Sequence, residues 1–216
     1  MEQGYEQWIK LWPYAVLLVA VGAWAVYHFL TPSGWREWAG AGTVQAFIIA
    51  LCAEMYGFPL TLYLLAGILP LDIPIVRSSG HLWATLLGYG SLGGAIEMFI
   101  ASAFLLAGLL LIVKGWVKIY FLGDGLVTNG VYALVRHPQY AGIFLVILGQ
   151  LIDWPTIPTL VLAPLIILLY RSLARREEEA LFERFGEEYL AYQGNVPMFV
   201  PRWRSLRQAF SAGGAT

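Results

Sequence analysis

YAGIFLVILGQLIDWPTIPTLVLAPLIILLY, residues 140–170, is an apolar stretch of 31 residues with one polar interruption at Asp153-Trp154-Pro155. A helix crosses a bilayer with about 20 residues, so a single helix over the whole stretch would be overlong. Proline removes a backbone donor and breaks a helix interior. The stretch therefore predicts two helices, over 140–152 and 156–170, that form a hairpin with a tight turn between them.

The remainder of the chain predicts three more membrane-spanning helices. The 216 residues are 59% hydrophobic and only 12% charged, whereas a soluble domain carries about 25% charged residues. The apolar runs cover 12–30, 44–69 and about 95–120. We therefore expect an all-α, multi-pass integral membrane protein with about five transmembrane helices in the lipid bilayer.

The basic residues predict the orientation of these helices. With five spans, eleven Lys and Arg residues fall on the side of the 31–43 loop, the 114–138 loop and the C-terminal tail, and two fall on the other side. If 140–170 were one span, the division would be nine against four. Since basic residues concentrate in cytoplasmic loops, we expect the N-terminus outside and the C-terminus in the cytosol.

A charged segment, 171–194, follows the last predicted span. Its apolar and aromatic residues recur at mostly helical spacing, which is typical of an amphipathic helix on the cytosolic membrane face. A hairpin brings its two ends together, so we expect Arg136, His137 and Tyr140 to lie close to residues 175–178. Cationic, anionic and aromatic groups in one place suit a zwitterionic ligand. The alternative is that each basic residue only anchors a span and that the Glu run is a solvated helical face.

Glu54 is a catalytic candidate because it lies inside an apolar run, roughly 15 Å deep at 1.5 Å per residue. An intramembrane carboxylate is costly, and it is a functional candidate by default. It would face a substrate cavity or accept a proton from the substrate. The alternative is a protonated Glu that bonds a neighbouring helix.

The sequence indicates neither a metal site nor a nucleic-acid partner. The three histidines lie in three separate regions of the chain and the single cysteine excludes a Cys-based site, so we expect no metal site. The net charge of −1 indicates no nucleic-acid partner.

Two blocks, LVTNGVYALVRHPQYAG and REEEALFERFGEEYLAYQGNVP, resemble the isoprenylcysteine carboxyl methyltransferase family and its wider membrane relatives, which include phospholipid N-methyltransferases and bacterial thiol methyltransferases. The family pattern reads Thr-x-Gly-x-Tyr, then Arg-His-Pro-x-Tyr-x-Gly, then Glu-Glu-x-x-Leu-x-x-x-Phe-Gly-x-x-Tyr-x-x-Tyr. The resemblance covers roughly residues 115–200. The matching residues are Thr128, Gly130, Tyr132, Arg136, His137, Pro138, Tyr140, Gly142, Glu177, Glu178, Leu181, Phe185, Gly186, Tyr189 and Tyr192.

The resemblance implies an S-adenosyl-L-methionine-dependent methyltransferase with its cofactor pocket open to the cytosol. Arg136, which is also a catalytic candidate, and Arg175 would bind the methionine carboxylate, and Glu178 or Glu177 the amino group. Tyr189 and Tyr192 would close a lid. Carried over by position, the cofactor-binding residues are Val131, Tyr132, Leu134, His137, Pro138, Tyr140, Arg175, Glu177, Glu178, Tyr189 and Tyr192.

The acceptor of the methyl group stays open, and so do two other classes of function. Residues 1–94 form the expected substrate-side transmembrane region, and residues 95–216 form the methyltransferase-like core. The acceptor would be a small hydrophobic or lipid-linked thiol, carboxylate or amine. An NADPH-dependent membrane reductase of the sterol type shares an Arg-His-Pro-x-Tyr-like element, and Glu54 would suit a transporter or scaffold. The Glu-Glu-x-x-Leu-x-x-x-Phe-Gly block favours the methyltransferase.

Overall fold

The structure is a computed structural model that describes residues 10, 12–29, 34–56, 59–68, 73, 77–122 and 125–202. The described residues fold into helices joined by short turns, with no strand among them, which confirms the all-α prediction. Three described helices are long and apolar enough to cross a membrane, namely α3 (Trp35–Tyr56), α6 (Gly90–Leu122) and α8 (Ile157–Phe185). These are the helices of an integral membrane protein.

The chain divides into two compact units. Unit 1 comprises Met1–Ala103 and Leu148–Tyr170, and unit 2 comprises Phe104–Ile147 and Arg171–Thr216. The long helices α6 and α8, and α7 (Pro138–Asp153) as well, each contribute residues to both units.

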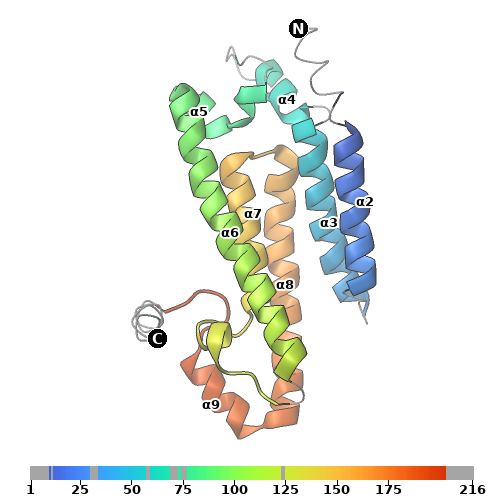
Figure 1. Ribbon diagram of the computed structural model, residues 1–216, viewed down its shortest axis with the longest axis vertical. Coiled ribbons are helices and arrows are strands. Elements are labelled where there is room, and N and C mark those ends of the chain that lie inside the picture. The colour runs from blue at the N-terminus through green and yellow to red at the C-terminus, as the bar shows by residue number, and fades with distance from the viewer. Residues whose placement is uncertain are drawn as a thin grey trace. The chain divides into compact units, whose positions relative to one another are not determined.

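In unit 1, α2 (Trp12–Phe29) packs beside α3 (Figure 1). The prediction of one span over 44–69 is wrong, because α3 begins at Trp35 and ends at Tyr56, and a separate helix, α4 (Leu60–Ile68), follows. Pro59 explains the break, since it has no N–H and disfavours helical geometry in the residue before it. Glu37 in the first turn of α3 suits the positive end of the helix dipole and explains the earlier start.

The buried carboxylate of Glu54 caps the start of α4. Its two oxygens accept the backbone N–H of Thr61 at 3.2 and 3.0 Å, and the hydroxyl of Thr61 donates to one of them at 2.8 Å. The N–H groups of the first helical turn have no partner within the helix, so this carboxylate supplies one. The Thr61 hydroxyl in turn accepts the N–H of Ile157 at 2.9 Å. Glu54 thereby links α3, α4 and the start of α8.

A second buried carboxylate, Glu97, fixes the segment before α6. This segment consists of a short 3₁₀ turn, η1 (Arg77–Gly80), and a short helix, α5 (Leu82–Leu87), which ends at a left-handed glycine. Glu97 accepts the N–H of Ala84 from α5. His81 places Nδ1 3.8 Å from Glu97 and 3.5 Å from the Asp153 carboxylate, so a polar cluster joins the starts of α5 and α6 to the end of α7.

The turn that the 140–170 stretch predicts is present between α7 and α8. Pro138 begins α7 as a first-turn residue that needs no N–H, and α7 ends at Asp153 just before Trp154-Pro155. Thr156 and Thr159 then cap α8 reciprocally, because the hydroxyl of each accepts the backbone N–H of the other at 3.2 and 3.0 Å. α8 continues past Tyr170 into the charged segment and ends at Phe185.

Unit 2 is assembled around a close crossing of α6 and α7. A Cβ on Gly108 would lie 2.6 Å from the carbonyl oxygen of Gly142, so the two backbones touch where neither residue has a side chain. Gly186 directly follows α8, adopts a φ of 54° and separates α8 from α9 (Glu187–Asn195). This left-handed conformation is costly for any residue other than glycine.

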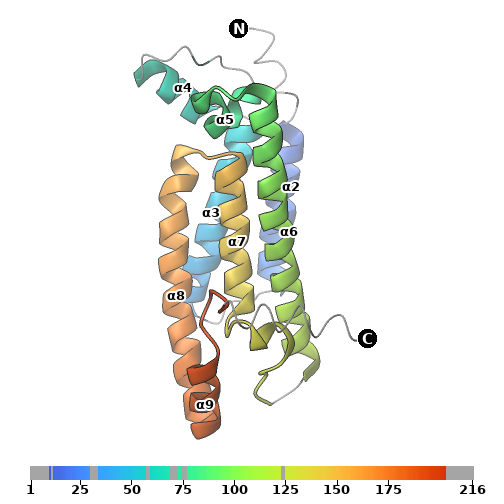
Figure 2. The same ribbon diagram turned by 90° about the vertical axis from the view of Figure 1, so that its left-hand side faces the viewer.

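The segment after α9 turns back and pairs with the chain that enters α7 (Figure 2). The N–H of Arg136 donates to the carbonyl of Pro197 at 2.9 Å, and the N–H of His137 donates to the carbonyl of Met198 at 3.1 Å. These two bonds satisfy backbone donors just before Pro138, where no helix can supply an acceptor. Residues 196–198 are thus a fixed part of unit 2.

Candidate active site

Two cavities adjoin in unit 2. The larger, of about 210 Å³, is here called the aromatic cavity, and the smaller, of about 100 Å³, the acidic cavity. Five residues line both cavities, namely Ile119, Tyr132, Arg136, His137 and Leu181. The aromatic cavity adds Gly125, Leu126, Val127, Arg184, Phe185, Tyr189 and Tyr192, and the acidic cavity adds Gln139, Tyr140 and Glu177. The two spaces therefore offer an aromatic end and an anionic end.

Arg136 lies in the wall between the cavities and binds three groups. Its Nε donates to Glu178 Oε1 at 2.7 Å, and one Nη donates to the carbonyls of Gln193, at 3.1 Å, and Val196. The side chains of Arg136 and Glu178 are only 10% and 9% exposed. The ion pair therefore joins the entry to α7, the charged part of α8 and the end of α9 in a largely dry environment.

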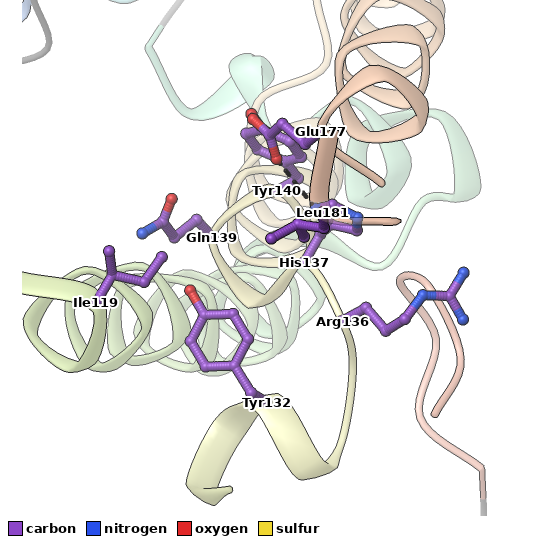
Figure 3. Close-up of a pocket in the computed structure, with 8 residues that line it drawn as sticks. All are labelled: Ile119, Tyr132, Arg136, His137, Gln139, Tyr140, Glu177 and Leu181. Atoms are coloured by element: carbon purple, nitrogen blue, oxygen red, sulfur yellow. Dashed lines mark hydrogen bonds and ion pairs between the residues drawn. The ribbon is translucent and has the colours of Figure 1, made fainter. Parts of the chain in front are cut away.

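His137 is held between two carboxylates. Its Nε2 lies 3.2 Å from Glu178 Oε1, and its Nδ1 lies 3.3 Å from Glu177 Oε2. The imidazole is parallel to the ring of Tyr140, with centroids 5.6 Å apart, and the Tyr140 hydroxyl donates to Glu177. Figure 3 shows Tyr140, His137 and Glu177 grouped together, while the guanidinium of Arg136 points toward the C-terminal segment. The predicted proximity of Arg136, His137 and Tyr140 to residues 177 and 178 is thus confirmed.

The ionisation of this cluster follows from its contacts. Burial alone would raise the pKa of Glu178, but the hydrogen bond and positive charge of Arg136, together with His137, lower it below the ordinary carboxyl value. Burial raises the pKa of Tyr192 to about 12. At neutral pH Glu178 is therefore an anion, and Tyr192 keeps the proton that it donates to the carbonyl of Tyr132 at 2.7 Å.

Glu177 and Glu178, the two predicted ligands of the amino group, differ in how many hydrogen-bond donors already face their carboxylates. Glu178 is buried, and its oxygens already face donors from Arg136, His137 and Gln193. Glu177 is 50% exposed and lines the acidic cavity. Glu177 is thus the carboxylate with an open side, although the sequence favours Glu178.

The other predicted residues lie in varied places. Tyr132, Tyr189 and Tyr192 line the aromatic cavity, as the carry-over implies. Pro138 is buried at the start of α7, and neither it nor Val131 nor Leu134 lines the two cavities. Arg175 is exposed and lines neither cavity. Glu54 belongs to unit 1 and bonds Thr61, and its catalytic role stays a prediction.

Two contact residues were not predicted from the sequence. Gln193 Nε2 donates to Glu178 Oε2 at 3.1 Å, and the ring of Phe199 lies against His137 with centroids 5.9 Å apart. Gln193 could have been found, because it lies four residues after Tyr189 and therefore on the same face of α9. Phe199 lies in an irregular segment where spacing gives no such signal.

Comparison with known proteins identifies similar sequences. Residues 86–188 match the family model described as phospholipid methyltransferase. Protein-S-isoprenylcysteine O-methyltransferase of Mus musculus is 42% identical over 77 residues, which are 35% of this chain and 27% of the relative. Its counterpart in Schizosaccharomyces pombe is 36% identical over 77 residues, 35% of this chain and 33% of the relative.

A bacterial protein gives a similar match. Cobalt-zinc-cadmium resistance protein CzcN of Cupriavidus metallidurans is 36% identical over 91 residues, 40% of this chain and 42% of the relative. The matches to these three relatives thus span only 27% to 42% of the relatives' own length. They confirm the resemblance that the two sequence blocks predict, and in its matched segment the chain is similar to the isoprenylcysteine carboxyl methyltransferase-like and phospholipid methyltransferase-like family of integral membrane methyltransferases.

Proposed function

We propose that this protein transfers a methyl group from S-adenosyl-L-methionine to a small hydrophobic or membrane-associated acceptor. The observation that carries the proposal is the pair of adjoining cavities, one lined by tyrosines and the other by the half-exposed carboxylate of Glu177. S-Adenosylmethionine is a flat base at one end and a zwitterionic amino acid at the other. Its two ends correspond to the two kinds of wall.

The residues present fit this cofactor. Glu177 would bind the amino group, and Phe185, Tyr189 and Tyr192 would pack against the base. The hydroxyl of Tyr189 is buried without a hydrogen-bond partner in the described part of the chain, so a ligand group would satisfy an atom that is otherwise costly to bury. Arg136 has one Nη that donates to no described group, and this nitrogen would bind the carboxylate.

The chemistry places modest demands on the protein. The cofactor supplies a sulfonium methyl group, which a nucleophile attacks in line with the leaving sulfur. The chain's own residues bind and orient the reactants, which lowers the entropic part of the barrier. They also exclude water, since His137 and Glu178 are each 7% exposed. An amine acceptor would in addition need a group that takes its proton.

The membrane arrangement is part of the proposal. With α2 and α7 as spans beside α3, α6 and α8, the chain would have five, and the eleven-to-two distribution of basic residues would put the cavities on the cytosolic side. The relatives from Mus musculus and Schizosaccharomyces pombe are named for O-methylation of isoprenylcysteine. For this chain we propose only the wider class of hydrophobic or lipid-linked thiols, carboxylates and amines.

Isothermal titration of the detergent-solubilised protein with S-adenosylhomocysteine tests the proposal. We expect saturable binding, and we expect Glu177→Gln to weaken it at least tenfold. Glu179→Gln is the matched control, because Glu179 is an exposed neighbour that lines neither cavity. Absence of binding by the unmodified protein would contradict the proposed function.

A further inference from the structure

Five side chains in unit 2 form a chain of polar contacts that ends at the acidic cavity. Gln193 Nε2 donates to Glu178 Oε2 at 3.1 Å, and Glu178 Oε1 lies 3.2 Å from His137 Nε2. On the other edge of the imidazole, Nδ1 lies 3.3 Å from Glu177 Oε2, and Glu177 Oε1 accepts from the Tyr140 hydroxyl. The orientation of Glu177 therefore depends on residues that it does not touch.

Two carboxylates face the two edges of the His137 ring. Nε2 lies at hydrogen-bonding distance, 3.2 Å, from Glu178 Oε1, and Nδ1 lies at ion-pair distance, 3.3 Å, from Glu177 Oε2. The ring therefore lies between the buried carboxylate and the carboxylate that lines the acidic cavity. The charged and titratable groups around the ring are Glu177, Glu178 and Tyr140, together with Arg136 behind Glu178.

Packing fixes the plane of this imidazole. The Tyr140 ring lies parallel to it, with an interplanar angle of 2°, and the tilted ring of Phe199 contacts it as well. Phe199 also packs edge-on against Phe144, with centroids 5.1 Å apart. The C-terminal segment that pairs with residues 136 and 137 thus also restricts the rotation of the ring.

We propose that His137 and Gln193 are positioning residues that together aim the Glu177 carboxylate at the amino group of the cofactor. This inference rests on the proposed function and adds a division of roles to it. Glu177 contacts the ligand, and Glu178 is the inner link that Gln193 and Arg136 hold in place. His137 transmits that constraint through its ring, which contacts both carboxylates.

Two ligands that differ at the amino-acid end test this division. S-Adenosylhomocysteine has the amino group, and 5′-deoxy-5′-methylthioadenosine lacks the whole amino-acid portion while keeping the nucleoside. We expect Gln193→Leu to weaken S-adenosylhomocysteine about tenfold and to leave methylthioadenosine unchanged, both measured by titration in detergent. Asn195→Ala is the control on the same helix, because within the described part of the chain its side-chain amide bonds only the Ala191 carbonyl, and it should change neither affinity.

The role of His137 has its own readout. His137→Gln removes the ring that lies between the two carboxylates, so we expect it to weaken S-adenosylhomocysteine about tenfold and to leave methylthioadenosine unchanged. Equal weakening of the two ligands would overturn the positioning role of His137.

The outcomes distinguish failure of the positioning role from failure of the proposed function. If the unmodified protein binds neither ligand, the proposed function fails. If it binds S-adenosylhomocysteine but Gln193→Leu weakens both ligands equally, or neither, the positioning role is overturned and the function stands. Should Gln193→Leu not fold, Phe199→Leu loosens the imidazole from its other side, and the same selective loss is required.

Discussion

Arg136 and Glu178, 42 residues apart in the sequence, form a direct ion pair of 2.7 Å between the entry to α7 and the charged part of α8. The same guanidinium binds the carbonyls of Gln193 and Val196 at the end of α9. One side chain thereby joins three of the segments of unit 2 that surround the cavities. The pair is as much a structural element as a part of the site.

Arg136→Ala should destabilise the protein by about 3 kcal/mol, because it leaves a buried carboxylate without its partner and removes a donor from two carbonyls. Thermal unfolding in detergent measures the effect as a lower Tm. Arg176→Ala is the control, since Arg176 is exposed on the same part of α8. Equal Tm values for the two variants would show that the ion pair contributes no stability.

Stability should fall on acidification through the same pair. The pKa of Glu178 lies below its ordinary value of 4.5 in the folded protein. The pair therefore contributes its full stability above pH 4.5 and loses it as pH falls through the lowered pKa. Melting curves from pH 7 downward should show a decline that is smaller in Glu178→Gln. An identical decline in both proteins would assign the acid sensitivity to other groups.

Gly108→Ala should destabilise the crossing of α6 and α7 by about 1–3 kcal/mol, despite the better helix propensity of alanine. The added Cβ would meet the Gly142 carbonyl and the Val146 side chain. Gly42→Ala in α3 is the matched control, because a Cβ there meets nothing within 4 Å. The comparison of the two Tm values checks the crossing, and an unchanged Tm for Gly108→Ala would contradict it.

Glu54→Ala should lower the Tm, because the first turn of α4 loses its acceptor. Thr61→Val removes the hydroxyl from the same bond network without touching the carboxylate. If Glu54 acts only through its contacts with Thr61, the two variants lose activity in proportion to the stability that each loses. Loss of turnover in Glu54→Gln with a normal Tm would instead support the catalytic role that its position in an apolar run predicts.

The sequence predicts the class of fold and the location of the site well, for identifiable reasons. Length and hydropathy suffice for helices such as α6, and Pro138 and Asp153-Trp154-Pro155 define both ends of α7 through local backbone chemistry. The proximity of Arg136 to Glu178 follows from chain topology, since two segments that flank a hairpin must meet. Hydropathy alone does not reveal the break before α4, because Pro59 interrupts the apolar run without adding a polar residue.

The finer division of roles depends on tertiary contacts that no spacing encodes. Glu177 and Glu178 are adjacent in sequence, yet one is half exposed and the other is enclosed by Arg136, His137 and Gln193. Neighbours on a helix point about 100° apart, so only the packing decides which of them faces the cavity. The same holds for Phe199, whose position follows from the two backbone bonds of residues 136 and 137.

The most direct test is an experimental structure of the protein with S-adenosylhomocysteine bound. The account predicts the ligand across the two adjoining cavities of unit 2, with its amino nitrogen about 3 Å from a Glu177 oxygen. Its adenine ring should lie beside Tyr189 and Tyr192. A ligand bound elsewhere, or one whose amino group does not contact Glu177, would contradict the proposed function and the role of Glu177.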